Sequence, residues 1–341
     1  MNLQHAPRPF ARAKLGRIAV MGGTGLIGRH VLHALRNIGG GDIVATYRTR
    51  PPVEIPGVDW RGADLLDPAT ARTVLEDVDV VVLCAGRVST TAELRRDPVT
   101  SVNETLRIGL NALEAASAHG LRQVVLVSSC TGYPEKAGAS EEAAMFTGDP
   151  PSAWFGVGWM HRFLEKQLEW HSRHLGRIKS GIALRPTLVY GPHDDFSDES
   201  GHFVPSLIRR VVNRERPIEV WGDGRQSRNL IHAADVAGAV VAALQRPEAY
   251  AAYNVATPES VSVNEVLATL LRIEGFVDAD IVHRLDRSGG ASAMSVSAAA
   301  FCQFYGWKAS MPLHEGLAQT IDWYRKAIAG PAGRPATGSP G

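Results

Sequence analysis

The chain has 341 residues, and 36 Lys and Arg against 35 Asp and Glu give a net charge of +1. This balance argues against a nucleic-acid partner, and no apolar run is long enough to span a membrane. Three cysteines without Cys-x-x-Cys spacing argue against a disulfide framework or a metal site, and the basic N-terminal segment lacks the apolar stretch of a secretory signal. We therefore expect a cytoplasmic protein.

Strands and helices alternate along the first 190 residues. Residues 17–21 form a short strand, and 26–37 have helical spacing that Gly39-Gly40-Gly41 ends. The later elements are strands at 42–47, 78–84, 123–128 and 182–184, and helices at 102–119 and 159–174. Apolar strands separated by helices are typical of parallel sheets with both faces covered. The expected fold is therefore α/β, a Rossmann-like doubly wound parallel sheet.

The elements become shorter and less regular after Pro192. We expect a helix at 204–214, a strand at 218–221 and a helix at 234–245. The predicted division is a Rossmann domain over 15–191 plus 229–255, a smaller C-terminal substrate-binding lobe over 192–228 plus 256–326, and loose tails at 1–13 and 329–341.

The stretch Gly22-Gly23-Thr24-Gly25-Leu26-Ile27-Gly28 follows a strand and opens a helix. That context separates a dinucleotide-binding loop from a glycine-rich turn without a ligand. The glycines let the backbone approach a pyrophosphate, and the helix N-terminus favours its charge. The predicted cofactor contacts on the loop and after the fourth strand are Gly22, Thr24, Gly25, Leu26, Ile27, Gly28, Ala85 and Gly86.

The end of the second predicted strand distinguishes between cofactors. An NAD site usually has an acid there, but this stretch reads Thr46-Tyr47-Arg48-Thr49-Arg50. Arg48 and Arg50 can pair with a 2′-phosphate, so NADP is favoured over NAD. The alternative is two solvated surface arginines. Asp64 and Leu65, after the third strand, are expected to contact the adenine.

With these motifs, the chain resembles the extended short-chain dehydrogenase/reductase family, the sugar-nucleotide epimerases and dehydratases, over about residues 16–326. Within it, the resemblance is closest to members that epimerise C3 and C5 of GDP-4-keto-6-deoxymannose and reduce its C4. Four pieces carry this narrower resemblance: Ser128-Ser129-Cys130 with Tyr133-Pro134; Tyr190-Gly191-Pro192-His193-Asp194-Asp195-Phe196; His202-Phe203-Val204-Pro205 with Arg209-Arg210; and Trp221-Gly222-Asp223-Gly224 with Arg228.

The resemblance implies roles for these residues. Cys130 and His202 match the acid and base of epimerisation, and Ser128 or Ser129 matches the catalytic hydroxyl. The residues that match positions gripping a nucleotide diphosphate are Arg210, Trp221 and Arg228. A homodimer that pairs helices 102–119 and 159–174 is also implied. A Cys at a sheet edge near a cofactor and a histidine is expected to have a lowered pKa. The non-catalytic alternatives are that Cys130 is a small buried residue that fills space in the core, and that His202 is an ordinary loop histidine.

One departure from the family is informative. The family's Tyr-x-x-x-Lys pair supplies the proton for ketone reduction, and here Val157 and His161 stand in its place, with Glu165 fixing the register. His161 can bind a ribose hydroxyl of the cofactor, or it can act as a catalytic residue that protonates an oxygen. Loss of a positioned general acid costs about 10²–10⁴ in rate. We therefore expect weak or absent 4-reductase activity.

These observations predict an NADP-binding epimerase that acts at C3, C5 or both of a GDP- or dTDP-linked 4-keto-6-deoxysugar. Two alternatives remain open. One is an NADPH-dependent 4-ketoreductase or C4 epimerase that uses His161 and Tyr133, and the other is a non-catalytic NADP-binding regulator. An acidic loop of Asp194, Asp195, Asp198 and Glu199 is expected to be solvated rather than to hold a cation.

Overall fold

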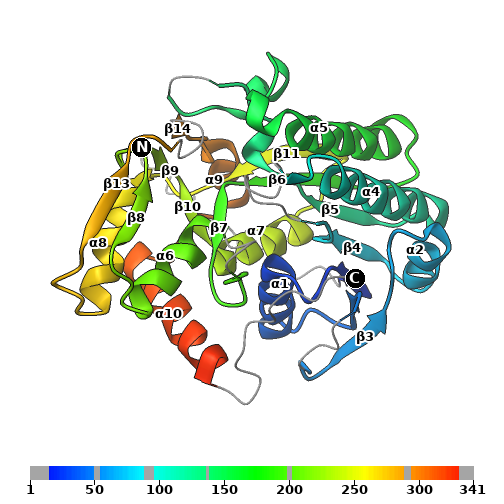
Figure 1. Cartoon of the computed structure of the whole chain (residues 1–341). Helices are drawn as coiled ribbons and strands as arrows, with labels where there is room; N and C mark the ends of the chain where they lie inside the picture. Colours follow the sequence, from blue (N-terminus) through cyan, green and yellow to red (C-terminus); the bar gives the residue numbers. More distant parts are fainter. Residues whose placement is uncertain are drawn as a thin grey trace, which may run out of the picture.

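A computed structural model of the chain describes residues 15–49, 54–87, 96–135, 138–197, 202–287 and 293–329 (Figure 1). Its centre is a seven-stranded sheet in the order β11-β6-β5-β4-β1-β2-β3, and every neighbouring pair is parallel. The strands are β1 (Ile18–Met21), β2 (Ile43–Tyr47), β3 (Val58–Gly62), β4 (Val80–Leu83), β5 (Gln123–Val127), β6 (Gly181–Pro186) and β11 (Tyr250–Val255). This is the Rossmann-like doubly wound sheet that the sequence predicts.

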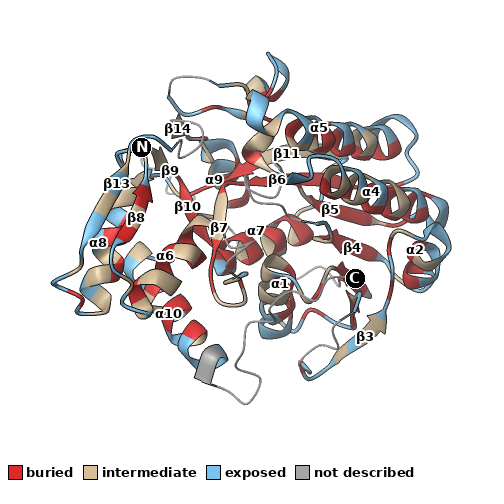
Figure 2. Ribbon diagram, viewed as in Figure 1, coloured by how far each residue is buried: buried red, intermediate tan, exposed pale blue. Residues whose placement is uncertain are grey.

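Helices cover both faces of the sheet and create two apolar cores. In β1, Ile18 and Val20 belong to one core, and Ala19 and Met21 belong to the other. The helices of the first core are α1 (Leu26–Asn37), α7 (Ala233–Gln245) and α9 (Ala299–Tyr305), and those of the second are α2 (Pro68–Leu75), α4 (Thr100–His119) and α5 (Phe155–Glu169). Because both faces are covered, the central strands are buried along their length (Figure 2).

Local sequence explains where several helices begin and end. The Asp67 side chain accepts hydrogen bonds from two backbone N–H groups at the start of α2, and Pro68 occupies the first helical position. Gly120 adopts the left-handed conformation that ends α4. The predicted bounds of α1 agree with the structure, and those of α4 differ by two residues.

Helix α5 begins at Phe155, four residues before the predicted start. Glycines at 156 and 158 have low helix propensity, so the pattern favours a later start. Tertiary packing explains the difference, because a Cβ on Gly158 would lie 2.6 Å from Pro150 and 2.8 Å from the carbonyl oxygen of Thr131. The last predicted turn, Trp170–His174, is a π-helix rather than an α-helix.

A third apolar core lies beside the sheet, at the left of Figure 1. It is enclosed mainly by α6 (Phe203–Val212), β8 (Ile218–Trp221), α8 (Val263–Ile273) and α10 (Leu313–Ala329). Short strands complete this part: β7 (Leu188–Tyr190), β9 (Ser227–Arg228), β10 (Leu230–His232), β12 (Val261–Ser262), β13 (Ile281–Arg284) and β14 (Ala293–Met294). The boundaries predicted for the two domains stay a prediction, and the predicted N-terminal tail lies outside the described residues.

The described residues between β5 and α5 include three 3₁₀ turns, η1 (Cys130–Gly132), η2 (Glu142–Phe146) and η3 (Ser152–Trp154). The guanidinium of buried Arg162, on α5, donates hydrogen bonds to the carbonyls of Gly132 and Gly148 at 2.8 Å and 2.6 Å. This single side chain therefore ties the connection to α5. Among the described helices, none combines the length and the apolar character that crossing a membrane requires.

Candidate active site

The glycine loop after β1 has the shape of a dinucleotide cradle. Gly22 has a φ of +84°, and a Cβ there would lie 2.8 Å from the Ala85 backbone after β4. A Cβ on Gly28 would lie 2.2 Å from the carbonyl oxygen of Gly22, so α1 packs directly on the loop. Gly25, the N-cap residue of α1, provides no side-chain cap. The helix N-terminus is therefore open to an anion such as a pyrophosphate.

The other predicted cofactor contacts lie at the same carboxyl edge of β1 and β4, which are neighbouring parallel strands. Thr24, Leu26, Ile27 and Ala85 are partly exposed, and Gly86 is exposed. Ligands of open α/β sheets bind at this edge. The residues present therefore fit a dinucleotide.

Arg48 follows β2, and 53 % of its side-chain surface is exposed. Its guanidinium lies 3.7 Å from the Asp64 carboxylate and 3.8 Å from the Glu104 carboxylate, which is too far for a hydrogen bond. Arg87 lies 3.7 Å from the same Glu104 oxygen. Two guanidiniums thus lie near one Glu104 oxygen, which is buried and accepts no hydrogen bond from either of them. Arg50 lies outside the described residues.

The two predicted adenine contacts have different surroundings. Asp64 is exposed, whereas Leu65 is buried in the core beneath α2 and α4. The Leu65 carbonyl accepts a hydrogen bond from the Asn111 side chain at 2.9 Å. Asp64 is therefore the member of the pair whose side chain a ligand can reach.

Cys130 begins the turn after β5 and is buried, with 5 % of its surface exposed. It packs in a small apolar cluster with Tyr133, Met145 and Val296. Burial raises the pKa of the Cys130 thiol to about 12, although the Arg228 cation acts in the opposite direction. The predicted lowered pKa is therefore wrong, because loss of solvation outweighs the nearby positive charge.

The two serines before Cys130 have different partners. The Ser128 hydroxyl is buried and donates to the Glu165 carboxylate at 2.6 Å. Ser129 is partly exposed, and its oxygen accepts hydrogen bonds from the Thr131 backbone N–H at 3.2 Å and the Thr131 hydroxyl at 3.0 Å. Ser129 is therefore the hydroxyl of the two that keeps exposed surface at the end of β5.

A buried ion pair lies behind these serines. The Arg185 guanidinium donates to both Glu165 oxygens, from Nη2 at 2.7 Å and from Nε at 3.0 Å and 3.2 Å. Burial alone would lower the pKa of Arg185, but the hydrogen bonds and the charge of Glu165 raise it above its usual value. The pair connects α5 to β6. It holds in place Glu165, the residue from which the sequence comparison counted the positions along α5.

Tyr133 belongs to the same buried network. Its hydroxyl donates to the Asn254 side chain at 2.7 Å and accepts from Arg185 at 2.9 Å. Burial raises the pKa of Tyr133 to about 12. To act as the proton donor of the reductase alternative, this hydroxyl would have to exchange its hydrogen bond to Asn254 for one to the substrate.

Val157 and His161 lie one turn apart on α5. His161 keeps part of its surface exposed, but its Nδ1 is buried without a hydrogen-bond partner. Burial lowers the pKa of His161 to about 4, so the imidazole is neutral at pH 7. A buried nitrogen without a partner requires an explanation, and a cofactor or substrate hydroxyl would supply the missing partner.

His202 occupies the N-cap position of α6 without a capping hydrogen bond from its side chain, and its Nδ1 lies 3.2 Å from the Asp194 carboxylate. Asp194 is 7 % exposed. The prediction that this acid belongs to a solvated loop is therefore wrong for Asp194, because the turn after β7 directs it inward. Asp195 is exposed, and Asp198 and Glu199 lie outside the described residues.

The three predicted nucleotide contacts come from the smaller part of the structure. Arg210 donates to the Glu219 carbonyl at 2.8 Å, and Trp221 is 38 % exposed, with the Arg287 guanidinium 5.5 Å from its ring centre. Burial lowers the pKa of Arg228, and the neighbouring Cys130 acts against that shift. The structure thus brings Arg228 to the thiol, a proximity that sequence spacing did not indicate.

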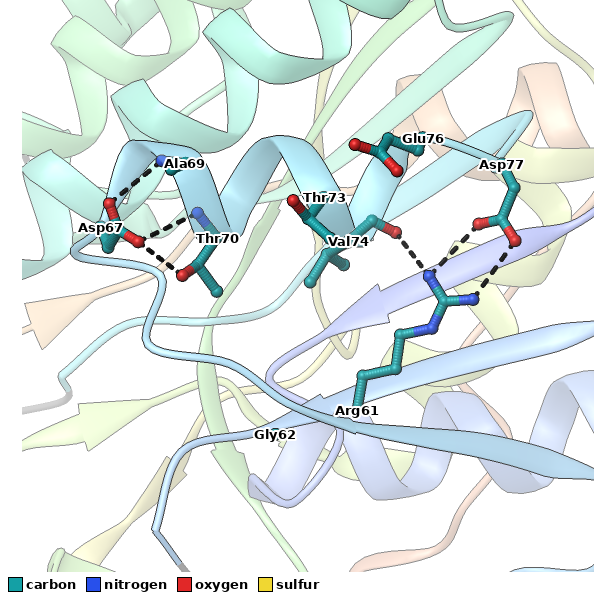
Figure 3. Close-up of a pocket in the computed structure, with 9 residues that line it drawn as sticks. All are labelled: Arg61, Gly62, Asp67, Ala69, Thr70, Thr73, Val74, Glu76 and Asp77. Carbon is teal, nitrogen blue, oxygen red and sulfur yellow. Dashed lines mark hydrogen bonds and ion pairs between the residues drawn. The ribbon is translucent and has the colours of Figure 1, made fainter.

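A separate surface pocket lies between β3 and α2 (Figure 3). Arg61 in its wall donates to Asp77 and to the Val74 carbonyl, and Asp67 caps α2. Arg61 and Asp77 therefore satisfy each other, and Asp67 is satisfied by groups of the first turn of α2. Within the described residues, no group of three or more His, Cys, Asp or Glu side chains is arranged to hold a metal ion.

Comparison with known proteins agrees with this geometry. A model of the NAD dependent epimerase/dehydratase family matches residues 18–256. GDP-L-fucose synthase 1 of Arabidopsis thaliana is 26 % identical over 322 residues, covering 92 % of this chain and 95 % of that protein. A dTDP-4-dehydro-6-deoxy-D-allose reductase of a Streptomyces species is 28 % identical over 324 residues, covering 90 % of this chain and 96 % of that protein.

The fold also matches solved structures. MoeE5 in complex with UDP-glucose and NAD superimposes with a TM-score of 0.77 at 26 % identity, over 92 % of this chain and 100 % of that one. The resemblance that the sequence motifs indicated, including the narrower one to GDP-L-fucose synthase, is confirmed by these relatives. The chain belongs to the NAD dependent epimerase/dehydratase family.

Proposed function

We propose that the protein is a nucleotide-sugar epimerase that acts at C3, C5 or both of a nucleotide-4-keto-6-deoxysugar. The observation that carries the proposal lies on α5, where Glu165 is held by its ion pair with Arg185. Counted back from Glu165, Val157 and His161 take the positions at which the resemblance to the family expects the reductive Tyr and Lys. Val157 cannot protonate a ketone oxygen. Epimerisation next to the ketone needs only an acid, a base and a donor to the enolate oxygen.

Cys130 and His202 are the proposed acid–base pair. A thiol whose pKa is raised to about 12 is protonated at pH 7, so Cys130 is suited to donate a proton rather than to remove one. His202, which is hydrogen-bonded to a carboxylate, is then the base. Ser129 is the proposed donor to the keto oxygen, because the Ser128 hydroxyl is bound to Glu165.

NADP is the proposed cofactor. The glycine loop from Gly22 to Gly28 would hold the pyrophosphate, Asp64 would meet the adenosine, and Arg48 would pair with the 2′-phosphate. His161 would donate to a ribose hydroxyl or to the ketone. A bound nicotinamide would supply hydride chemistry at C4 of the sugar, but because Val157 offers no proton to the ketone oxygen, the proposed 4-reductase activity is weak or absent.

Arg210, Trp221 and Arg228 are the proposed contacts of the nucleotide diphosphate. Bidentate guanidinium groups suit phosphate oxygens, and an exposed indole offers a surface for a base. The relatives carry names of enzymes for GDP- and dTDP-linked sugars, which supports either nucleotide.

A second copy of the chain is the proposed partner. Phe155, Trp159 and Phe163 are exposed at 51 %, 41 % and 46 % and follow one another by four residues along α5, so they form one apolar stripe. We expect a homodimer through α4 and α5. A Trp159→Glu/Phe163→Glu variant should be monomeric by light scattering, and a monomeric unmodified protein would refute this part of the proposal.

The test is proton exchange in D₂O. Incubation with GDP- or dTDP-4-keto-6-deoxysugars should place deuterium at C3 or C5 and invert the carbon, as followed by NMR. The competing 4-ketoreductase is favoured by the name of the Streptomyces relative and predicts NADPH oxidation at an ordinary enzyme rate. A non-catalytic regulator predicts NADP binding without exchange.

A matched variant distinguishes the epimerase from the 4-ketoreductase. Replacement of Val157 by Tyr together with His161 by Lys should create NADPH-dependent reduction, because the pair supplies the missing proton to the ketone oxygen. Val157→Phe with His161→Lys is the control, since it has the same bulk but no hydroxyl. Fast reduction by the unmodified protein, insensitive to Cys130→Ser, would overturn the epimerase proposal.

A further inference from the structure

We propose that Arg87 is a second guanidinium of the site for the 2′-phosphate of the cofactor, and that Glu104 is the internal acid with which that phosphate competes for Arg48 and Arg87. The inference rests on the proposed cofactor, since it names residues that would distinguish NADP from NAD. The sequence assigned neither Arg87 nor Glu104 to a site, because neither lies in the stretch after the second strand that usually indicates the cofactor.

Four charged side chains of alternating sign form a row at this place. Arg48 Nε lies 3.7 Å from Asp64 Oδ1, and Arg48 Nη1 lies 3.8 Å from Glu104 Oε2. Arg87 Nη1 lies 3.7 Å from the same Glu104 oxygen. One carboxylate oxygen therefore has beside it two guanidiniums that come from separate segments of the chain.

The sheet topology brings these segments to one edge. Strands β2 and β4 are the two neighbours of β1 and run parallel to it, so their carboxyl ends lie on either side of the glycine loop that follows β1. Arg48 comes directly after β2, and Arg87 comes shortly after β4. Since ligands of open α/β sheets bind at this edge, both arginines are carried to the cofactor side of the sheet.

The backbone at Arg87 is held against α4, the helix that also carries Glu104. The Arg87 N–H donates to the Thr105 hydroxyl at 2.9 Å, and that hydroxyl donates to the Arg87 carbonyl at 3.3 Å. A Cβ on Gly86 would lie 2.9 Å from the Thr105 side chain, so the backbone packs directly on the helix. The Arg87 side chain is nevertheless 53 % exposed. Its base is therefore fixed, while its guanidinium can reach a ligand.

Glu104 faces both arginines without a hydrogen bond to either. Its Oε2 is buried and has no hydrogen-bond partner among the described residues. Distances of 3.7 Å and 3.8 Å exceed hydrogen-bond length, so this oxygen has lost water without gaining a donor. A phosphate group has three strong acceptor oxygens and can bind two guanidiniums at once. The arrangement therefore favours a phosphate that bridges Arg48 and Arg87 over the single carboxylate oxygen.

Another acid close to Arg87 is bound mainly to backbone. The Asp97 carboxylate accepts from the N–H groups of Thr100 at 3.0 Å and Val99 at 3.1 Å. Hydrogen bonds from Thr100 and Val99 lower the pKa of Asp97, and the Arg87 cation adds a smaller effect. Asp97 therefore organises the start of α4, and Glu104 is the acid that a phosphate would replace beside Arg87.

The test is fluorescence titration of the full chain with NADPH and NADH, with competition by adenosine 2′,5′-bisphosphate and adenosine 5′-monophosphate. Arg87→Met should weaken binding of NADPH and of the bisphosphate about tenfold or more, since a charge-assisted hydrogen bond is lost. Binding of NADH and of the monophosphate should change by less than about twofold. Arg72→Met is the matched control, because Arg72 is exposed and its carbonyl lies 3.2 Å from His119 at the other end of α4; it should change none of these affinities.

Glu104→Gln should have the opposite effect. It keeps the shape of the side chain but removes a negative charge beside the phosphate, so NADPH should bind about threefold more tightly or better, with NADH unchanged. Glu114→Gln is the control, since it removes the same charge from an exposed position about 15 Å further along the same helix.

Three results would overturn the inference. Arg87→Met could weaken NADPH and NADH alike, which would make Arg87 a contact of the pyrophosphate; it could weaken neither; or Glu104→Gln could weaken NADPH. Should Glu104→Gln fail to fold, the titrations of Arg87→Met decide, because that side chain is exposed.

The proposed function and this inference fail separately. Absence of deuterium exchange with every keto-sugar refutes the epimerase, whereas the cofactor titrations need no sugar and still decide the role of Arg87. Equal affinities of the unmodified protein for NADPH and NADH refute the proposed cofactor and, with it, this inference.

Discussion

Removing the charge of Glu165 should destabilise the protein strongly. The Glu165 side chain is 0 % exposed and that of Arg185 is 3 % exposed, so neither group can recover solvent in the folded state. Glu165→Gln keeps the shape but leaves the Arg185 cation buried without its counter-ion. Breaking a buried pair from one side costs about 3–5 kcal/mol, and we expect the free energy of unfolding to fall by that amount.

A double-mutant cycle measured by urea unfolding checks this reasoning. Arg185→Met should cost about as much as Glu165→Gln, because it leaves a buried carboxylate unpaired. The double variant should cost much less than the sum, which gives a coupling energy of roughly 3 kcal/mol. Ser128→Ala is the control, since it removes one hydrogen bond to the same carboxylate and should cost about 1–3 kcal/mol. Additive single effects below about 1 kcal/mol would show that the pair is not buried as described.

Three further predictions concern cofactor, pH and chemistry. Arg48→Asp should weaken NADP binding at least tenfold with little change for NAD, as measured by fluorescence titration; equal affinities of the unmodified protein for the two cofactors would contradict the NADP assignment. Burial, with a smaller contribution from His30, lowers the pKa of His232 from 6.5 to about 4, so the unfolded chain takes up a proton that the folded chain refuses. Stability from this group should therefore fall as pH drops from about 6.5 to about 4, by about 3 kcal/mol, and His232→Asn should flatten that part of the stability profile; an unchanged profile would contradict the assignment. Cys130→Ser should retain deuterium exchange but lose inversion, because the acid is missing, whereas His202→Asn should lose the exchange itself; the reverse pattern would make Cys130 the base.

Sequence alone determined the features that depend on local pattern. The apolar strands, the bounds of α1 and the glycine loop follow from residue type and spacing, because glycine conformation and helix signals act over a few residues. The family also follows, since its motifs are contiguous. The comparison of Val157 and His161 with the family's Tyr and Lys stays a prediction, which rests on Glu165 four residues after His161.

Only the tertiary structure decided the features that depend on what surrounds a side chain. Cys130 has the residue type of an activated thiol, but neighbours from distant segments, such as Met145 and Val296, remove its solvent and raise its pKa. Asp194 lies in an acidic stretch, yet the turn at His193 buries it against His202. Solvation and partner distance are set by segments far apart in the chain, so composition and spacing do not fix them.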